Sequence, residues 1–230
     1  MPTAATDATT SVITAAAFGS AHDQVTAFSV FMRALGDWWR DWVNMAVLNL
    51  AWMLCWLTIV LGPPATFAAY RVANDFANER TLYPRELPGM LRRYFLQSWG
   101  WFLLQLLVAA GVLVNLQFYG EMQSGVGAVL QGATLVVAGI WLLLQLYALP
   151  YLMEQGQPGL QLALRNALLT ALASPLYTLI IGVIVALLLA ICVRLPFLLL
   201  FGVPMLIAVI GSHAVLERLE RFGKRQSRES

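Results

Sequence analysis

Few side chains in this sequence of 230 residues have the chemistry of a catalytic or metal-binding group. It holds two histidines, His22 and His213, which stand far apart in the chain. No HExxH motif and no Cys-His ligand cluster can be assembled from them, so we predict no metal site and no cofactor. We expect His213 to act as an interfacial hydrogen-bonding group. These residues therefore favour a protein that is not an enzyme.

The cysteines and the aspartates lead to the same prediction. Cys55 and Cys192 belong to different depths of two predicted membrane helices, so their Cα atoms cannot come within the about 7 Å that a disulfide requires. We expect two free thiols that pack as small apolar side chains. Every aspartate lies outside the predicted membrane spans, which argues against paired-aspartate proteolysis and against a buried carboxylate relay.

Polar groups that could bind a ligand gather in two loops that we predict to be cytoplasmic. One interpretation is a concave, basic site in which both loops bring their side chains together. The other is a solvated surface whose positive groups anchor anionic lipid, and we favour it. The candidate binding residues are Gly62, Pro63, Pro64, Thr66, Tyr70, Arg71, Arg92, Arg93, Pro150, Glu154, Arg165 and Asn166.

Uncharged polar residues also occur within the predicted spans. Gln105 and Gln145 have a similar depth on neighbouring helices and can pair with each other. Such hydrogen bonds contribute about 0.6 to 2 kcal/mol each, so we favour contacts between helices over a path for a polar solute. The residues of this intramembrane polar layer are Asn49, Gln105, Asn115, Gln117, Gln131 and Gln145.

The composition explains why these groups must be positioned by membrane helices. Apolar residues make up 60% of the chain and charged residues 11%, whereas soluble proteins carry about 25% charged residues. So few charges cannot cover a water-facing surface, which excludes a soluble enzyme, a secreted toxin and a disordered chain. The net charge of +2 is too small and too dispersed to indicate binding of nucleic acid. We therefore predict an integral membrane protein whose first partner is the lipid bilayer.

Gaps between charged residues locate the membrane spans, because a charge at the bilayer centre costs about 2.5 to 3.5 kcal/mol. Five gaps are long enough for one helical crossing of about 20 residues. Runs such as TLIIGVIVALLLAICV lack the alternation of a membrane barrel, so we expect an all-α fold. The five predicted spans are Val43–Leu61, Trp99–Phe118, Val126–Leu149, Leu176–Val193 and Pro196–Leu216, and Pro196 is expected to open the last helix.

The distribution of basic residues predicts the orientation of these spans. One side carries eleven of the 14 lysines and arginines, and the other side carries Arg33, Arg40 and Arg194. The positive-inside rule then predicts a cytoplasmic C-terminus and, with five crossings, an N-terminus outside. The eleven are Arg71, Arg80, Arg85, Arg92, Arg93, Arg165, Arg218, Arg221, Lys224, Arg225 and Arg228.

Four segments organise the chain. Residues 1–24 are rich in Thr, Ala and Ser and are expected to be a disordered arm. Residues 25–42 repeat apolar side chains every three or four positions, which predicts an amphipathic helix at the membrane interface with its tryptophans at headgroup level. Residues 43–216 form the five-helix transmembrane domain, and residues 217–230 form a basic cytoplasmic tail.

Two amphipathic helices, which we call the elbow helices, are predicted in the cytoplasmic loops. The first covers Thr66 to Glu79 after Pro63 and Pro64 end the first span, and it turns Arg71 and Asp75 toward water. The second covers residues 158–173 after Pro150 ends the third span. The order helix, elbow, helix thus occurs twice, and both gene duplication and chance account for it equally well.

Several motifs give the chain a resemblance to a family. The runs NLAWMLCW and GPPATFAAY resemble the signature of the YesL-like bacterial membrane proteins, and the second run here has one proline more than that pattern. The resemblance covers roughly residues 30 to 220 and implies a bacterial inner-membrane protein. Members are commonly encoded beside carbohydrate ABC transporter components, so it implies transporter subunits as partners. The matching segments are Asn49–Trp56, Gly62–Tyr70, Tyr147–Tyr151 and Leu164–Leu168.

Two functional hypotheses follow from the sequence. The first is a non-enzymatic accessory or regulatory component of a transport system for carbohydrate, as the resemblance and the lack of catalytic groups indicate. The second is a small permease or channel for a polar solute, which would be a homo-oligomer because five helices enclose little space. Gln105 and Gln145 would line the path of such a permease.

Overall fold

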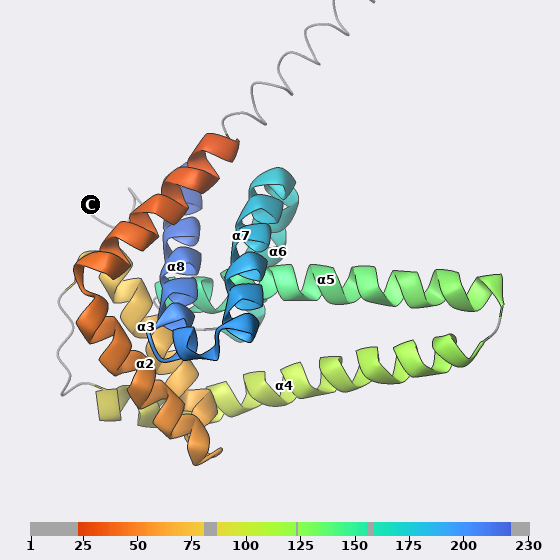
Figure 1. The fold of residues 1–230 in the computed structure, drawn as a ribbon, viewed down its shortest axis with the longest axis horizontal. Helices are drawn as coiled ribbons and strands as arrows, with labels where there is room; N and C mark the ends of the chain where they lie inside the picture. Colours follow the sequence, from red (N-terminus) through yellow and green to blue (C-terminus); the bar gives the residue numbers. More distant parts are fainter. Residues whose placement is uncertain (1–22, 81–86, 123, 156–158, 222–230) are drawn as a thin grey trace, which may run out of the picture.

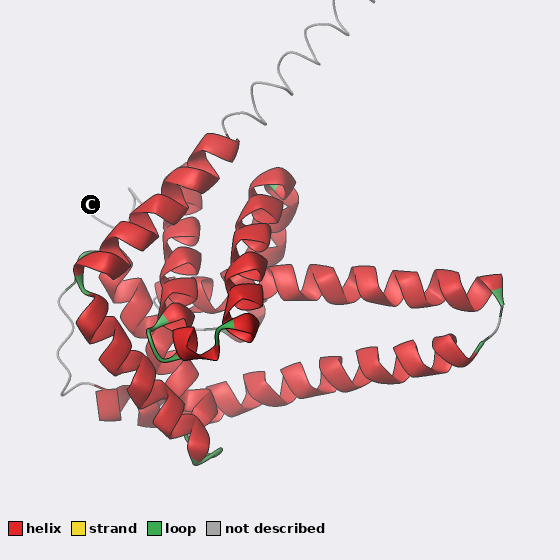
Figure 2. Ribbon diagram, in the orientation of Figure 1, coloured by secondary structure: helices red, strands yellow, loops and turns green. Residues whose placement is uncertain are grey.

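The computed structural model describes residues 23–80, 87–122, 124–155 and 159–221. Within these ranges all regular secondary structure is helical, as the sequence predicts (Figure 2). A helix covers residues 23–40, which we call the N-terminal helix. Almost all of the arm predicted to be disordered lies outside the described residues.

The described helices form a body from which one long hairpin projects (Figure 1). The hairpin consists of α4 (Leu87–Glu121) and α5 (Gly125–Glu154), which run side by side in opposite directions. In the view of Figure 1, α7 and α8 run steeply across the direction of the hairpin. Besides the N-terminal helix, the body contains α2 (Trp42–Leu57), α3 (Gly62–Ala77), α6 (Leu160–Ala173), α7 (Pro175–Arg194), the short 3-10 helix η2 (Pro196–Leu199) and α8 (Val203–Arg221).

Three of these helices, α4, α5 and α7, are long and apolar enough to cross a membrane. The 35 residues of α4 extend over roughly 50 Å, more than the ~30 Å of bilayer hydrocarbon. Apolar side chains such as Leu107 and Val129 are exposed along both arms of the hairpin, as lipid-facing residues would be. The chain is thus a helical membrane protein in its architecture. The helices α2 and α6 are apolar but shorter.

The connection between α2 and α3 differs from the predicted first span. The helix α2 ends at Leu57, and the two prolines lie in the first turn of α3 instead of after α2. This position is favourable, because the first helical N–H groups have no intrahelical partner that proline would remove. The turn is fixed by Trp99, whose indole N–H donates to the carbonyl of Val60 at 3.2 Å. Ile59 adopts a positive φ of 60° in this turn.

The first elbow helix, α3, lies inside the body and not on its surface. Phe67 and Ala73 are buried, and α3 packs against α2, α4, α5 and α8. Asp75, which we expected to face water, is 6% exposed. The reason is that the polar side of α3 faces the end of α5, where Glu154 accepts a hydrogen bond from Asn74, and the local sequence of α3 does not indicate this. The second elbow helix, α6, packs mainly on α5 through Ala163 and Ala167.

Pro150 does not end α5, which continues to Glu154. A proline inside a helix leaves the carbonyl four residues earlier without its N–H partner, and here that carbonyl belongs to Leu146. Gly211 of α8 packs directly against it, since a Cβ at Gly211 would come within 2.8 Å of the Leu146 oxygen. A close approach between α8 and the kinked α5 thus accommodates the proline.

The last predicted span also begins differently. Pro196 opens η2, and Gly202 then adopts a φ of +94°, which favours glycine, before α8 starts at Val203. Most side chains of α8 are buried by protein on several sides. The first five residues of the predicted tail, 217–221, belong to α8, and residues 222–230 lie outside the described residues.

Arg218 at the end of α8 is completely buried, although we placed it in the basic cytoplasmic tail. Its guanidinium lies 3.6 Å from the ring centroid of Tyr177 and donates to Ser174 at 3.1 Å and to Asp23 at 3.3 Å. The neighbouring Arg221 also donates to Asp23, at 2.9 Å. These bonds hold the start of the N-terminal helix against the end of α8.

Candidate functional site

The polar residues of the first elbow helix bond to the end of α5. Arg71 donates to the carbonyl of Met153 at 3.0 Å and forms an ion pair with Asp75 at 2.9 Å. The carboxylate of Glu154 accepts hydrogen bonds from Asn74 at 2.9 Å and from Asn78 at 2.6 Å. Arg71 thus binds one of the unpaired carbonyls at the C-terminus of α5, where positive charge is favoured. Of the candidate binding residues, the structure brings together Arg71 and Glu154.

Asp75 connects this group to the end of α3. Besides Arg71 it faces Arg80, whose Nη1 atom is 3.7 Å from its carboxylate. Burial raises the pKa of Asp75 despite the two opposing arginines. The carboxylate therefore has its two cationic partners, Arg71 and Arg80, beside it in the interior.

The other predicted basic residues lie elsewhere. Arg92 and Arg93 are on the exposed face of α4, where Arg93 lies 5.8 Å from the ring centroid of Tyr94. Arg165 is exposed on α6, and the adjacent Asn166 is half-buried. The hydrogen bonds described above join α3 to α5 and do not include these four residues.

The turn residues of the predicted site have a packing role. Thr66 accepts hydrogen bonds from the indole N–H groups of Trp52 at 3.0 Å and Trp56 at 3.2 Å, and it donates to the carbonyl of Gly62 at 3.0 Å. The hydroxyl thereby makes all three bonds that it can form. A Cβ at Gly62 would lie 2.6 Å from the Trp56 ring, so glycine is needed there. Pro63 and Pro64 are buried beside it.

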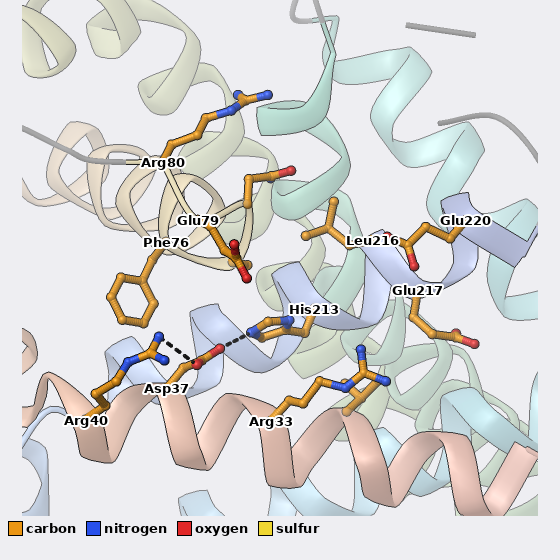
Figure 3. A pocket seen from close by; sticks show the side chains of 13 residues that line it. Arg33, Asp37, Arg40, Phe76, Glu79, Arg80, His213, Leu216, Glu217 and Glu220 are labelled. Atoms are coloured by element: carbon orange, nitrogen blue, oxygen red, sulfur yellow. Dashed lines mark hydrogen bonds and ion pairs between the residues drawn. The ribbon is translucent and has the colours of Figure 1, made fainter. Parts of the chain in front are cut away.

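A polar cleft of about 800 Å³ opens between the N-terminal helix, the end of α3 and α8 (Figure 3). At its centre Asp37 accepts a hydrogen bond from Arg40 at 3.1 Å and lies 2.9 Å from Nε2 of His213. We call this hollow the polar cleft. Its charged lining consists of Arg33, Asp37, Arg40, Glu79, Arg80, His213, Glu217 and Glu220.

The polar cleft is continuous with the group on α3 and α5, because Asn78 and Arg80 belong to both. Positive and negative side chains alternate along its walls. Such a lining suits a polar surface that carries both charges, bound through paired ionic contacts. Phe76 adds an apolar contact at the same place.

Sequence reasoning missed this cleft. Asp37 and His213 are separated by 176 positions in the chain, so no local motif joins them. The spacing of Arg33, Asp37 and Arg40 does place them on one face of a helix. This charged face was the one feature of the sequence that could have indicated the cleft. A helix whose polar face is simply solvated has the same pattern, so the feature is not specific.

In the intramembrane polar layer, Gln105 and Gln145 meet across the hairpin. Gln105 donates to Gln145 at 2.7 Å and accepts from the indole of Trp141 at 2.8 Å. Asn115 bonds within its own helix to Gly111, and Gln131 donates to the carbonyl of Leu116 at 3.4 Å.

Asn49 is the buried member of the predicted layer. Its amide nitrogen donates to the carbonyl of Leu199 and so ties α2 to η2. Its side-chain oxygen Oδ1 is buried and has no hydrogen-bond partner. Both cysteines are free thiols, as the sequence predicts.

Among residues 23–80, 87–122, 124–155 and 159–221, no three His, Cys, Asp or Glu side chains gather as a group that could hold a metal ion. Comparisons of the chain with protein families, with curated proteins and with solved structures find no match.

Proposed function

We propose that this chain is a non-enzymatic bacterial inner-membrane protein that acts as an accessory or regulatory component of a transport system. Its hairpin crosses the bilayer, and its polar cleft contacts a partner subunit. The YesL-like resemblance supports this role, because that family is commonly encoded beside carbohydrate ABC transporter components.

The observation that carries the proposal is the arrangement of amides between α4 and α5. Gln105 bonds to Gln145 and Trp141, and Gln145 donates back to the carbonyl of Trp141 at 3.2 Å. A path for a polar solute needs groups that are free to replace its water. These groups bond to one another, which favours a role in helix packing over the alternative of a permease.

The orientation is the second part of the proposal. The charge gaps predict five crossings with the N-terminus outside, but the bonds from Arg218 and Arg221 to Asp23 favour an even number. The helix α2 has 16 residues, and its turn contacts Trp99 near the inner end of the predicted second span. We infer that α2 enters the bilayer from the cytoplasmic side and that α3 leads the chain back to the same side without crossing.

Four crossings then remain, formed by α4, α5, α7 and the segment from η2 through α8. Both ends of the described chain are cytoplasmic in this arrangement. The basic residues support it, since Arg33 and Arg40 join the other eleven and Arg194 alone is outside. Helices that all cross one bilayer run roughly along a common direction. We therefore expect the hairpin and α7 to lie more nearly parallel in a bilayer than they do in Figure 1.

Single-cysteine labelling tests the orientation in protein that carries Cys55→Ser and Cys192→Ser. Gly36→Cys is a mild probe, because a Cβ there meets no atom within 4 Å. We expect Met122→Cys to react from outside, and Gly36→Cys and Arg80→Cys to react only from inside. Labelling of Gly36→Cys from outside would restore the five-crossing orientation.

Recovery of the protein in native nanodiscs, with mass spectrometry of bound proteins, tests the function. We expect a stoichiometric transporter subunit. Arg33→Glu, in the polar cleft, should lose this subunit, whereas Arg92→Glu, exposed on α4 outside the cleft, should keep it. A homo-oligomer without another subunit, together with loss of solute uptake in Gln105→Leu, would favour the permease instead.

A further inference from the structure

Two small pockets adjoin between α2, α3 and α8, away from the polar cleft. The first has a volume of about 170 Å³ and is lined by apolar side chains that include Cys55 and Leu91. The second has a volume of about 200 Å³ and contains Asn49 and Tyr70. The pockets share three lining residues, Trp52, Ala69 and Met205.

The first pocket has the properties of a hydrocarbon site. Its α3 wall is built from small residues, Ala65, Ala68 and Ala69, which leave space beside the ring of Trp52. An apolar cavity of about 150 Å³ stays dry in proteins and binds a molecule of the size of benzene. Part of an aliphatic chain therefore fits this pocket better than water does.

The second pocket contains a polar atom that lacks a partner. Asn49 is completely buried, and its oxygen Oδ1 accepts no hydrogen bond from the protein. Leaving a buried acceptor unpaired costs about 1 to 3 kcal/mol, so such atoms in folded proteins call for an explanation. Two donors that line the same pocket are already engaged, since Trp52 donates to Thr66 and Thr66 donates to Gly62.

Tyr70 completes the polar end of the second pocket. Burial raises the pKa of Tyr70 to about 12, so its hydroxyl stays protonated at neutral pH and is able to donate as well as accept. The polar end thus offers one buried acceptor and one hydroxyl, and it lacks a charged group. This composition matches an uncharged headgroup.

We propose that the two adjoining pockets bind one membrane lipid, with its hydroxyl headgroup donating to Asn49 and its hydrocarbon chain lying beside Cys55. The chain enters at the open side of the first pocket, where two of its lining residues, Ala51 and Pro88, are exposed. The unpaired oxygen of Asn49 selects lipids that carry a donor over hydrocarbons of the same length.

The rate at which Cys55 reacts with N-ethylmaleimide measures occupation of the first pocket. The protein carries Cys192→Ser and is placed in vesicles of phosphatidylcholine, whose headgroup has no hydrogen-bond donor. We expect 1-decanol to slow the reaction at least fivefold, and decane at the same content to slow it less than twofold. Equal effects of the two additives, or no effect of either, would overturn the proposal.

Substitutions separate binding in the pockets from general effects on the membrane. Ala69→Leu adds bulk at a residue that lines both pockets, so protection by 1-decanol should disappear. The matched control is Ala138→Leu, which fills an apolar hollow of about 370 Å³ on the hairpin that contains no buried carboxamide. It should leave the protection unchanged, and loss of protection in this control would contradict a local site.

Asn49→Leu tests the headgroup contact itself. Decanol and decane should protect Cys55 equally in this variant, because the acceptor is gone. Asn49 also donates to the carbonyl of Leu199, so its substitution could prevent folding. In that case the comparison of decanol with decane on the protein with Asn49 intact decides whether the pockets prefer a ligand with a donor. A preference for decanol that persists in folded Asn49→Leu protein would overturn the role of Asn49.

Discussion

The hairpin of α4 and α5 and the helix α8 are both built mainly from apolar residues, but they differ in what surrounds them. Along the part of the hairpin that projects from the body, side chains such as Leu107 and Val129 are exposed, and α4 and α5 run beside each other (Figure 1). In α8, side chains such as Val209 and Ile210 are completely buried by other helices. Hydropathy reports that a side chain avoids water, and it does not report whether lipid or protein replaces the water.

The two regions also differ in how they use glycine and charge. Gly139 on the hairpin has free space around it, whereas Gly211 on α8 lies against the backbone of α5. The hairpin keeps its charges at its ends, whereas α8 carries Arg218 into the core of the body. A compensated buried charge thus marks the helix that is packed by protein, whereas close backbone contact also occurs at the tip of the hairpin, where Gly127 lies against Met122.

Removal of the buried arginine should have the largest effect on stability. Arg218→Leu leaves Asp23 and Glu217 without a buried cationic partner, so we expect the free energy of unfolding to fall by about 3 to 5 kcal/mol. A denaturant titration of the purified protein measures this. Arg221→Leu is the control, because this half-exposed side chain should contribute less than about 1 kcal/mol. Equal losses in the two variants would mean that α8 is no more closely packed at Arg218 than at its surface.

The glycines compare the two regions directly. Gly211→Ala forces a methyl group against the carbonyl of Leu146 and should destabilise the protein by about 1 to 3 kcal/mol. Gly139→Ala meets nothing within 4 Å and should stabilise it by up to about 1 kcal/mol through helix propensity. Thermal unfolding of both variants in the same detergent gives the sign of each change. A neutral Gly211→Ala would refute the close contact between α5 and α8.

Loss of the amide pair should weaken the hairpin alone. Gln105→Leu removes the bonds to Gln145 and Trp141, and we expect a loss of about 0.6 to 2 kcal/mol. Hydrogen exchange at residues 94–121 and 125–145 measures the local effect, with Gln117→Leu on the same helix as the control. The body should keep its protection from exchange, and a general loss would show that the two regions unfold together.

Acidification gives the smallest expected effect. Burial would raise the pKa of Asp23, but the hydrogen bond from Arg221 and the charge of Arg218 outweigh it and hold the pKa below its ordinary value. The stabilisation from this carboxylate is present above the ordinary pKa of about 4 and is lost as the pH falls through the lower value. Protection from hydrogen exchange at residues 23–30, measured against the intrinsic rate at each pH, should therefore fall below pH ~4, and Asp23→Asn should show the same loss at neutral pH. Exchange that is unaffected by either change would mean that these residues stay in place without Asp23.

Features that depend on local pattern are predictable from this sequence. Gln105 and Gln145 stand at matching depths in apolar helices, and this is enough to pair them. Prolines predict breaks in helices, but α5 continues past Pro150, where Gly211 packs against the carbonyl of Leu146 from a position 61 residues further along the sequence. The local pattern of α5 therefore does not indicate that the helix continues.

Features that depend on distant partners are not predictable from it. The alternation of Glu217, Arg218 and Arg221 is that of a solvated helix, and nothing near them indicates that Tyr177 and Ser174 cover the arginine. The polar cleft is unpredictable for the same reason, because its central contact joins Asp37 and His213, which are far apart in the sequence. The hairpin is predictable from the sequence because every residue that faces lipid needs only an apolar side chain. In a protein interior, each position instead needs a side chain whose size, shape and polarity match its particular neighbours.

The position of α8 has a consequence for the order of assembly during translation. It is the last described helix, and Arg218 meets Asp23, Ser174 and Tyr177, all of which leave the ribosome earlier. The body therefore cannot close until the end of α8 has emerged. In contrast, Gln105 and Gln145, which pair in the hairpin, have both emerged long before that point. During this interval Asp23 and the binding surface for α8 stay open, and a ribosome that stalls before residue 218 leaves a chain with an inserted hairpin and no finished body.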